Sequence, residues 1–158
     1  MPWYVAKPRP GIHNIVQKMR DTLEGLDDSL NYLSFDEELE ILEWVYENAR
    51  RYWLRHSGPL QPRSKGGIDL VVIDSAPLLP LALLSKQQDP GRPVLYENRL
   101  MFQNGMAVDP SGPSARAWDF VQTRSSDVDL LVSPVPPELA PQILPRKSVG
   151  YIPVSVDQ

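Results

Sequence analysis

Three polar residues directly follow runs of apolar sequence and are the first candidates for chemistry. Asp74 follows Ile-Asp-Leu-Val-Val-Ile, and Asn98 and Arg99 follow Val-Leu-Tyr-Glu. If the two runs are neighbouring parallel strands, their carboxyl ends meet at one edge of a sheet, where ligands bind in open α/β folds. Carboxylate and amide groups can hydrogen-bond hydroxyls, and Arg can hold a phosphate or carboxylate in a bidentate way. We therefore expect Asp74, Asn98 and Arg99 to line a substrate cleft.

Two of these residues also have a structural interpretation. Asp74 can cap the helix that follows it, and Arg99 can be a solvated side chain. The sequence shows no nucleophile–base–orienter set, no cluster of metal ligands and no Gly-x-x-x-x-Gly-Lys phosphate loop. We therefore assign no catalytic residue and no metal. The two histidines, His13 and His56, are expected in a loop and at a helix end.

Composition restricts the class of protein. The chain has 158 residues, 42% hydrophobic and 23% charged, with a formal net charge of -4, which is typical of one globular domain. The acidic balance argues against nucleic-acid binding, which needs a basic face. There is no cysteine, which excludes disulfides and thiolate chemistry. We see neither a signal peptide nor an apolar run long enough for a membrane span, and we expect a cytoplasmic protein without a membrane partner.

Hydrophobic periodicity predicts alternating strands and helices. Helices are predicted over 12–25, 78–87 and 114–123, and a longer one begins at a Ser34–Glu37 capping box and ends before Gly58. The buried stripe expected for that helix is Leu39, Leu42, Tyr46, Ala49 and Trp53. Strands are predicted over 3–8, 68–73, 93–96, 128–133 and 149–154, with a short helical turn over 137–144 and a long loop over 102–114. This order predicts an α/β fold, a Rossmann-like parallel sheet with helices on both faces.

Six segments, in order along the chain, resemble motifs of one enzyme family. They are Trp-Tyr-Val-Ala-Lys-Pro (3–8), Lys-Met-Arg-Asp-Thr-Leu-Glu-Gly (18–25), Gly-Gly-Ile-Asp-Leu-Val-Val-Ile-Asp (66–74), Arg-Pro-Val-Leu-Tyr-Glu-Asn-Arg-Leu (92–100), Ala-Arg-Ala-Trp-Asp-Phe-Val (115–121) and Val-Gly-Tyr-Ile-Pro-Val-Ser-Val-Asp (149–157). Together they resemble the N-terminal, acceptor-side domain of retaining glycosyltransferases of the trehalose synthase and trehalose phosphorylase type, including the fungal clock-controlled relatives.

The resemblance implies an enzyme domain that binds glucose or trehalose, with a nucleotide sugar such as UDP-glucose as co-substrate and no resident cofactor. It also adds Arg20 to the candidate cleft, because Arg20-Asp21 stands where the family has His-Asn, and Arg99 stands where the family has a strand-end His. Arg20 has a structural interpretation as well, as part of a solvated helix face. Arg is always charged and cannot accept a hydrogen bond.

The same resemblance implies that residues 1–158 form a single, partial domain. We expect a chain truncated at both ends, without the nucleotide-sugar-binding domain, inactive alone and prone to self-association through an exposed sheet edge. The alternative is a non-catalytic sugar-binding or interaction module on the same fold. A nucleotide- or flavin-binding domain is disfavoured, since the Gly-x-Gly-x-x-Gly turn is missing.

Overall fold

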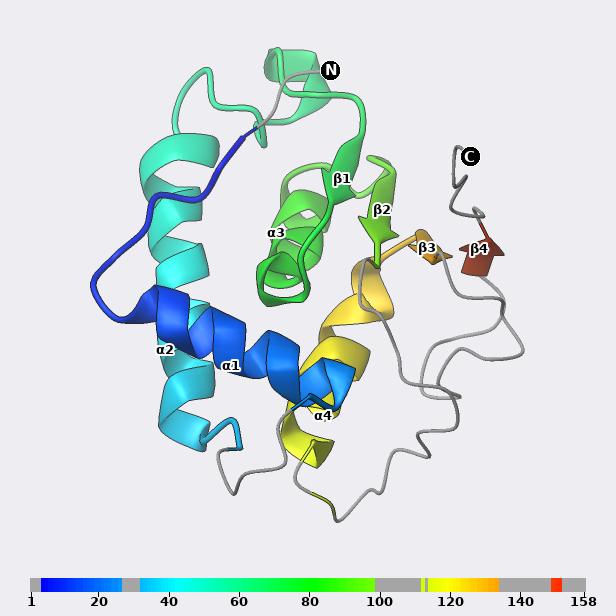
Figure 1. Cartoon of the computed structure of the whole chain (residues 1–158). Helices are drawn as coiled ribbons and strands as arrows, with labels where there is room; N and C mark the ends of the chain where they lie inside the picture. Colours follow the sequence, from blue (N-terminus) through cyan, green and yellow to red (C-terminus); the bar gives the residue numbers. More distant parts are fainter. Residues whose placement is uncertain (1–3, 27–31, 99–111, 113, 134–148, 152–158) are drawn as a thin grey trace, which may run out of the picture.

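The computed structural model describes residues 4–26, 32–98, 112, 114–133 and 149–151 (Figure 1). The helices are α1 (Ile12–Glu24), α2 (Phe35–Asn48), α3 (Pro80–Gln88) and α4 (Ala115–Arg124), and a π-helical turn, Ala49–Trp53, continues α2. The strands are β1 (Val71–Ile73), β2 (Val94–Glu97), β3 (Leu130–Ser133) and β4 (Val149–Tyr151).

The four strands form one parallel sheet in the order β1-β2-β3-β4. The register pairs Ile73 with Tyr96 and Tyr96 with Leu131. Helix α3 lies between β1 and β2 in the chain and α4 between β2 and β3, as crossover connections of parallel strands require. The predicted fold class is confirmed: the chain is an α/β protein with a parallel sheet flanked by helices, consistent with a Rossmann-like fold.

One apolar core joins the helices to the sheet. Its fully buried members come from every part of the fold: Met19, Leu23, Ile41, Val45, Leu79, Ala82, Val94, Tyr96, Phe120 and Val121. Trp44, Trp53 and Trp118, which helical spacing predicts to be core residues, are buried as well. Burial of apolar surface at about 25 cal/mol per Å² makes this core the main source of stability.

The start of α2 follows its prediction in detail. The side chain of Ser34 accepts a hydrogen bond from the backbone N–H of Glu37, and the Glu37 carboxylate accepts one from the backbone N–H of Ser34. Asp36, Glu37 and Glu38 occupy the first turn, where the helix dipole favours negative charge. Pro80 opens α3 at its first position, where a missing N–H costs nothing.

The predicted buried stripe of this helix is wrong in part. Ala49 and Trp53 are buried, but Leu39 and Tyr46 are exposed, and Ile41, Trp44 and Val45 face the core instead. The reason is a tertiary contact. The indole N–H of Trp44 donates to the Lys7 carbonyl at 2.7 Å, which turns this face of α2 towards the N-terminal segment.

The segment over 4–8 is not a strand, contrary to its prediction. Its backbone is held by α2 rather than by the sheet: the Lys7 N–H donates to Oδ1 of Asn48 at 2.6 Å, and Nδ2 of Asn48 donates to the Lys7 carbonyl at 3.2 Å. Strand β1 is shorter than predicted, beginning at Val71. The predicted turn over 137–144 and most of the loop over 102–114 lie outside the described residues.

Candidate functional site at the carboxyl edge of the sheet

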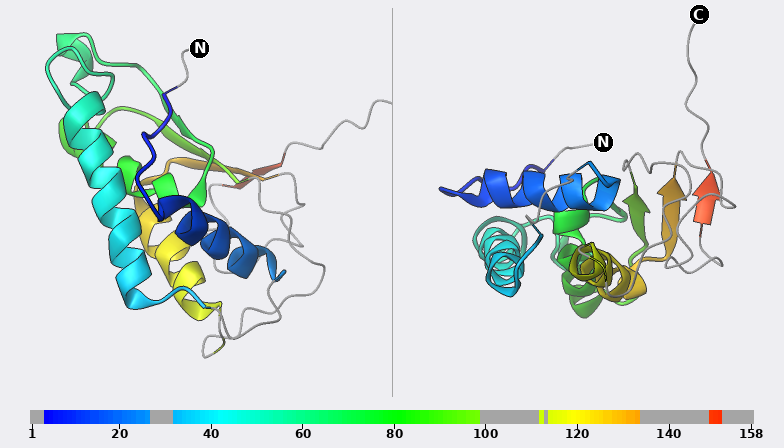
Figure 2. Two further views of the ribbon diagram at one scale, coloured as in Figure 1. Left: turned by 60° about the vertical axis from the view of Figure 1, so that its left-hand side comes forward. Right: turned by 60° about the horizontal axis from the view of Figure 1, so that its bottom comes forward.

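Helix α1 lies at the carboxyl ends of the strands. In Figure 2 (right) the strands point upward and α1 lies level with their tips, whereas α3 and α4 lie lower. Two glycines with positive φ bound the helix, Gly11 (81°) and Gly25 (69°), a backbone region that favours glycine. Ile12, Ile15 and Met19 anchor its inner face in the core. The faces of α1 that point away from the core can therefore border a binding site.

Asp74 stands at this edge, one residue beyond the end of β1. It is half-buried, and its carboxylate makes no hydrogen bond or ion pair within the described part of the chain. The short 3₁₀ turn that follows, Ala76–Leu78, has Ser75 as its capping residue, and no side chain provides a cap hydrogen bond. The capping alternative for Asp74 is therefore not realised, and the carboxylate is left for another partner.

Tyr96 and Asn98 lie beneath the same edge, at the end of β2. Both are 1% exposed, and the Tyr96 hydroxyl donates to Oδ1 of Asn98 at 3.4 Å. Burial raises the pKa of Tyr96, and the negative charge of Asp74 raises it further, so the phenol remains a protonated donor. Asn98 is also fixed through its backbone, whose N–H donates to the Val132 carbonyl at 2.8 Å. Asn98, which the sequence predicts to bind substrate, is thus buried under this edge of the sheet and hydrogen-bonded to Tyr96 and to the Val132 carbonyl.

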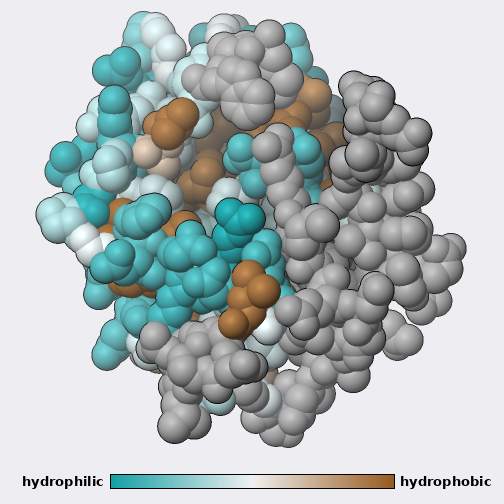
Figure 3. Space-filling view, viewed as in Figure 1, coloured by the Kyte–Doolittle hydropathy of each residue, from teal (hydrophilic) through white to brown (hydrophobic). Residues whose placement is uncertain are grey.

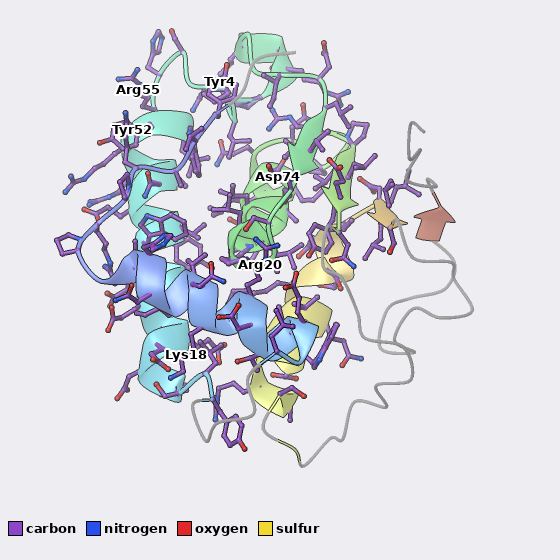
Figure 4. The ribbon with its side chains drawn as sticks, in the orientation of Figure 1. Tyr4, Lys18, Arg20, Tyr52, Arg55 and Asp74 are labelled. Atoms are coloured by element: carbon purple, nitrogen blue, oxygen red, sulfur yellow. The ribbon has the colours of Figure 1, made fainter. Side chains whose placement is uncertain are left out.

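Arg20 approaches from α1. Figure 4 shows it on the side of the helix that faces Asp74, whereas Lys18 points the opposite way. Its Nε donates to Oε1 of Glu24 at 3.2 Å, and the side chain is 58% exposed. A guanidinium has five N–H donors, so the contact with Glu24 orients the group and leaves donors for a ligand. Arg20 does not pair with Asp21, which accepts a hydrogen bond from Gln17 at 2.7 Å.

The remaining candidate residues lie elsewhere. Arg99 is outside the described residues. His13 is exposed in the first turn of α1, and His56 lies beyond the π-helical turn with its Nδ1 3.0 Å from the Ser57 hydroxyl. His13 therefore lies in a helix and not in the predicted loop, whereas His56 lies just beyond a helix end.

Among the described residues, the edge therefore combines a carboxylate without a partner (Asp74), a guanidinium with donors to spare (Arg20) and a buried phenol (Tyr96). Figure 3 views the molecule from this side and shows hydrophobic surface in a recess above the hydrophilic side chains of α1. Apolar surface beside a few directed polar groups is typical of a site for a small polar ligand. Within the described residues, no group of three or more His, Cys, Asp and Glu side chains could hold a metal ion.

Sequence reasoning missed Tyr96 and Glu24. Tyr96 occupies an alternate, inward position of a strand and therefore resembles any core aromatic residue. Glu24 is buried although charged, and its only signal is the i, i+4 spacing from Arg20.

The chain is distantly related to trehalose phosphorylases. It is 23% identical over 155 residues to a trehalose phosphorylase of Grifola frondosa, 24% identical to one of Pleurotus sajor-caju and 23% identical to one of Pleurotus pulmonarius. Each match covers 98% of this chain, which spans about a fifth of the length of these curated relatives. No family model matches the sequence. The described helices include none long and apolar enough to cross a membrane.

Proposed function

We propose that this chain is the acceptor-side region of a retaining glycosyltransferase that acts on glucose or trehalose. The observation that carries the proposal is the similarity to trehalose phosphorylases along 98% of the chain. The placement of Asp74 and Arg20 at the carboxyl edge of a parallel sheet supports it, because ligands of such sheets bind there.

In this proposal the carboxylate of Asp74 accepts hydrogen bonds from sugar hydroxyls, and the guanidinium of Arg20 donates them. The same guanidinium suits a phosphate, which it can bind in a bidentate way. Tyr96 and Asn98 form the buried base of the site. The glucosyl group passes through a cationic, oxocarbenium-like transition state. Its stabilisation would come from the cleft and from donor phosphates, held largely by the part of the relatives that this chain does not span.

The donor in this proposal is a nucleotide sugar such as UDP-glucose, bound as co-substrate, when trehalose is made; in the direction of phosphorolysis trehalose is the donor and phosphate the acceptor. No resident cofactor is required. The isolated chain is expected to be inactive for transfer. We also propose a cytoplasmic location, with which the cysteine-free composition is compatible.

A second candidate function is a non-catalytic sugar-binding module. The ion pair between Arg20 and Glu24 favours it, because a permanently charged, paired Arg cannot exchange a proton with a substrate. The two functions differ in one respect. The transferase region gains activity when it is joined to the complementary part of a trehalose phosphorylase, whereas the binding module does not.

Calorimetric titration of the purified chain with trehalose, glucose and inorganic phosphate tests the binding site. We expect millimolar binding of a sugar, weakened at least tenfold by Asp74→Asn or Arg20→Gln. Asp119→Asn, on exposed α4 surface, is the matched control and should bind as the unaltered chain does. Absence of sugar binding, or equal affinity in all variants, would contradict the proposed site. Turnover of UDP-glucose by the isolated chain would contradict the expectation that this chain alone is inactive for transfer.

A further inference from the structure

The last turn of α1 holds a carboxylate whose position does not favour the stability of the helix. Glu24 is 5% exposed, and taking a charged side chain out of water is costly. It is also the final residue of α1, where the negative end of the helix dipole disfavours a carboxylate. Burial and the dipole thus both act against the charge of Glu24.

The order of its ion pair along the helix is the less favourable one as well. Arg20 precedes Glu24 by four residues, whereas a carboxylate that precedes its cation by four gives the more stable helical pair. The favourable order occurs at the end of α2, where Glu47 precedes Arg51. The side chains of Arg20 and Arg51 are equally exposed, at 58%, but that of Glu47 is 37% exposed and that of Glu24 only 7%. The Glu47–Arg51 pair is therefore a natural comparison for the Arg20–Glu24 pair.

The two pairs differ in the guanidinium nitrogen that contacts the carboxylate. Glu47 lies 2.6 Å from Nη2 of Arg51, at the tip of the side chain. Glu24 accepts from Nε of Arg20 at 3.2 Å, at the base of the guanidinium. The contact at Nε leaves Nη1 and Nη2 of Arg20 as a pair of donors side by side, and such a pair matches two neighbouring acceptor oxygens.

This pair of donors is at the candidate site. Arg20 lies on the side of α1 that faces Asp74 (Figure 4). Glu24 comes from the same helix and is buried, so its carboxylate can fix the guanidinium without itself reaching a ligand. A side chain that is held before the ligand arrives loses less conformational entropy on binding.

We propose that Glu24 is a positioning residue, whose buried carboxylate holds Arg20 by Nε so that Nη1 and Nη2 face two adjacent oxygen atoms of a ligand. Adjacent hydroxyls of a sugar ring and two oxygens of a phosphate offer the same acceptor chemistry. This role rests on the ligand site of the proposed function, which both candidate functions share. In this role the charge of Glu24 serves ligand binding rather than stability.

Urea denaturation separates this role from a structural one without any ligand. Glu24→Gln removes a buried charge and keeps the shape of the side chain, and the Arg20 that remains is solvated, so the urea midpoint should not fall. Arg20→Gln leaves the buried carboxylate without its guanidinium, and the midpoint should fall. A midpoint that falls as far for Glu24→Gln as for Arg20→Gln would show that Glu24 is structural and would overturn the proposal.

Proton exchange at Nε tests the contact itself. In ¹⁵N–¹H NMR spectra, the Nε–H of Arg20 should exchange with water several-fold more slowly in the unaltered chain than in Glu24→Gln. Glu47→Gln, which alters the comparison pair, is the matched control and should leave the exchange at Arg20 unchanged. Equal exchange in the unaltered chain and in Glu24→Gln would show that the carboxylate does not hold the guanidinium, and would overturn the proposal.

NMR titrations with trehalose and, separately, with inorganic phosphate test the effect on binding and distinguish the two kinds of acceptor. Glu24→Gln should weaken binding about fivefold, because Arg20 is no longer held in place, and Glu47→Gln should bind as the unaltered chain does. In an Arg20→Gln background, Glu24→Gln should have no further effect, because Glu24 acts through Arg20. A further loss in that background would contradict the positioning role.

Failure of the proposed function would look different. If the unaltered chain bound neither ligand, the ligand site and the ligand-binding role of Glu24 would both be overturned. The urea and exchange measurements need no ligand, so they would still show whether Glu24 holds Arg20.

Discussion

The two ends of the sheet use their charged residues in opposite ways. At the amino end, the charges hold loops together: Arg63 binds Asp89 at 2.7 Å, and Asp129 accepts from Lys86 at 2.6 Å and from the Val94 N–H at 2.7 Å. At the carboxyl end, the Asp74 carboxylate has no partner within the described part of the chain, and Arg20 keeps donors free beyond its contact with Glu24. We infer that the amino edge serves stability and that the carboxyl edge is left for a ligand.

Arg92 shows the structural role most clearly. Its side chain is fully buried; the guanidinium donates to the carbonyls of Leu60 (3.2 Å) and Gln61 and to the Ser85 hydroxyl (3.4 Å). It thereby joins the segment before β1 to the turn before β2. Burial lowers its pKa, and the carbonyl groups are what make a buried cation tolerable.

Replacement of Arg92 should have the largest effect on stability. Arg92→Met keeps the apolar stem but leaves two buried carbonyls without their donors. We expect the free energy of unfolding to fall by about 3 kcal/mol, measured by urea denaturation. Arg50→Met, at an exposed site, is the control and should change it by less than about 0.5 kcal/mol. Equal losses of unfolding free energy in both variants would contradict the distinction between charged side chains that hold the fold together and exposed ones that do not.

Asp129→Asn should have an intermediate effect. The amide keeps an oxygen for the Val94 N–H but loses the charge that binds Lys86, so we expect a loss of about 1 kcal/mol in the same assay. Lys86→Met should cost a similar amount, and the double variant should cost less than the sum of the two. Strict additivity would contradict the direct ion pair.

Acid should remove the contribution of the Arg63–Asp89 pair at the amino edge to stability. Hydrogen bonds from the side chain and the backbone of Arg63 lower the pKa of Asp89 from 3.8 to about 2. A carboxyl whose pKa is lower in the folded state stabilises the protein above its unfolded pKa, and this contribution is lost as the pH falls from about 4 to 2. Urea midpoints measured at pH 5, 4, 3 and 2.5 should fall less steeply for Asp89→Asn than for the unaltered chain. Parallel curves would show that this ion pair contributes nothing to folding.

Asp74→Asn should have the smallest effect on stability. Because the carboxylate has no partner within the described residues, we expect a change below about 0.5 kcal/mol in the free energy of unfolding, with loss of sugar binding. A destabilisation as large as that of Asp129→Asn would mean that Asp74 is structural, and the contrast between the two edges would fail.

What the sequence predicts well is local. The capping box of α2, the glycine at the end of α1 and the order of strands and helices each depend on residues a few positions apart. The rotation of α2 about its own axis, which decides which of its side chains are buried, does not depend on neighbouring residues. It depends on the contacts of Trp44 and Asn48 with Lys7, which span 37 and 41 residues. The same limit applies to the site. Asp74 and Asn98 follow from strand ends, whereas the approach of Arg20 depends on where α1 packs, which no local pattern specifies.

The most direct test of the ligand edge is a ¹⁵N–¹H NMR titration of the chain with trehalose. We predict that the largest chemical-shift changes fall on the backbone amides around Arg20, Asp74 and Tyr96, with little change around Arg63, Asp89 and Asp129. Shifts concentrated at the amino edge, or none at saturating sugar, would contradict the assignment of the carboxyl edge as the sugar site.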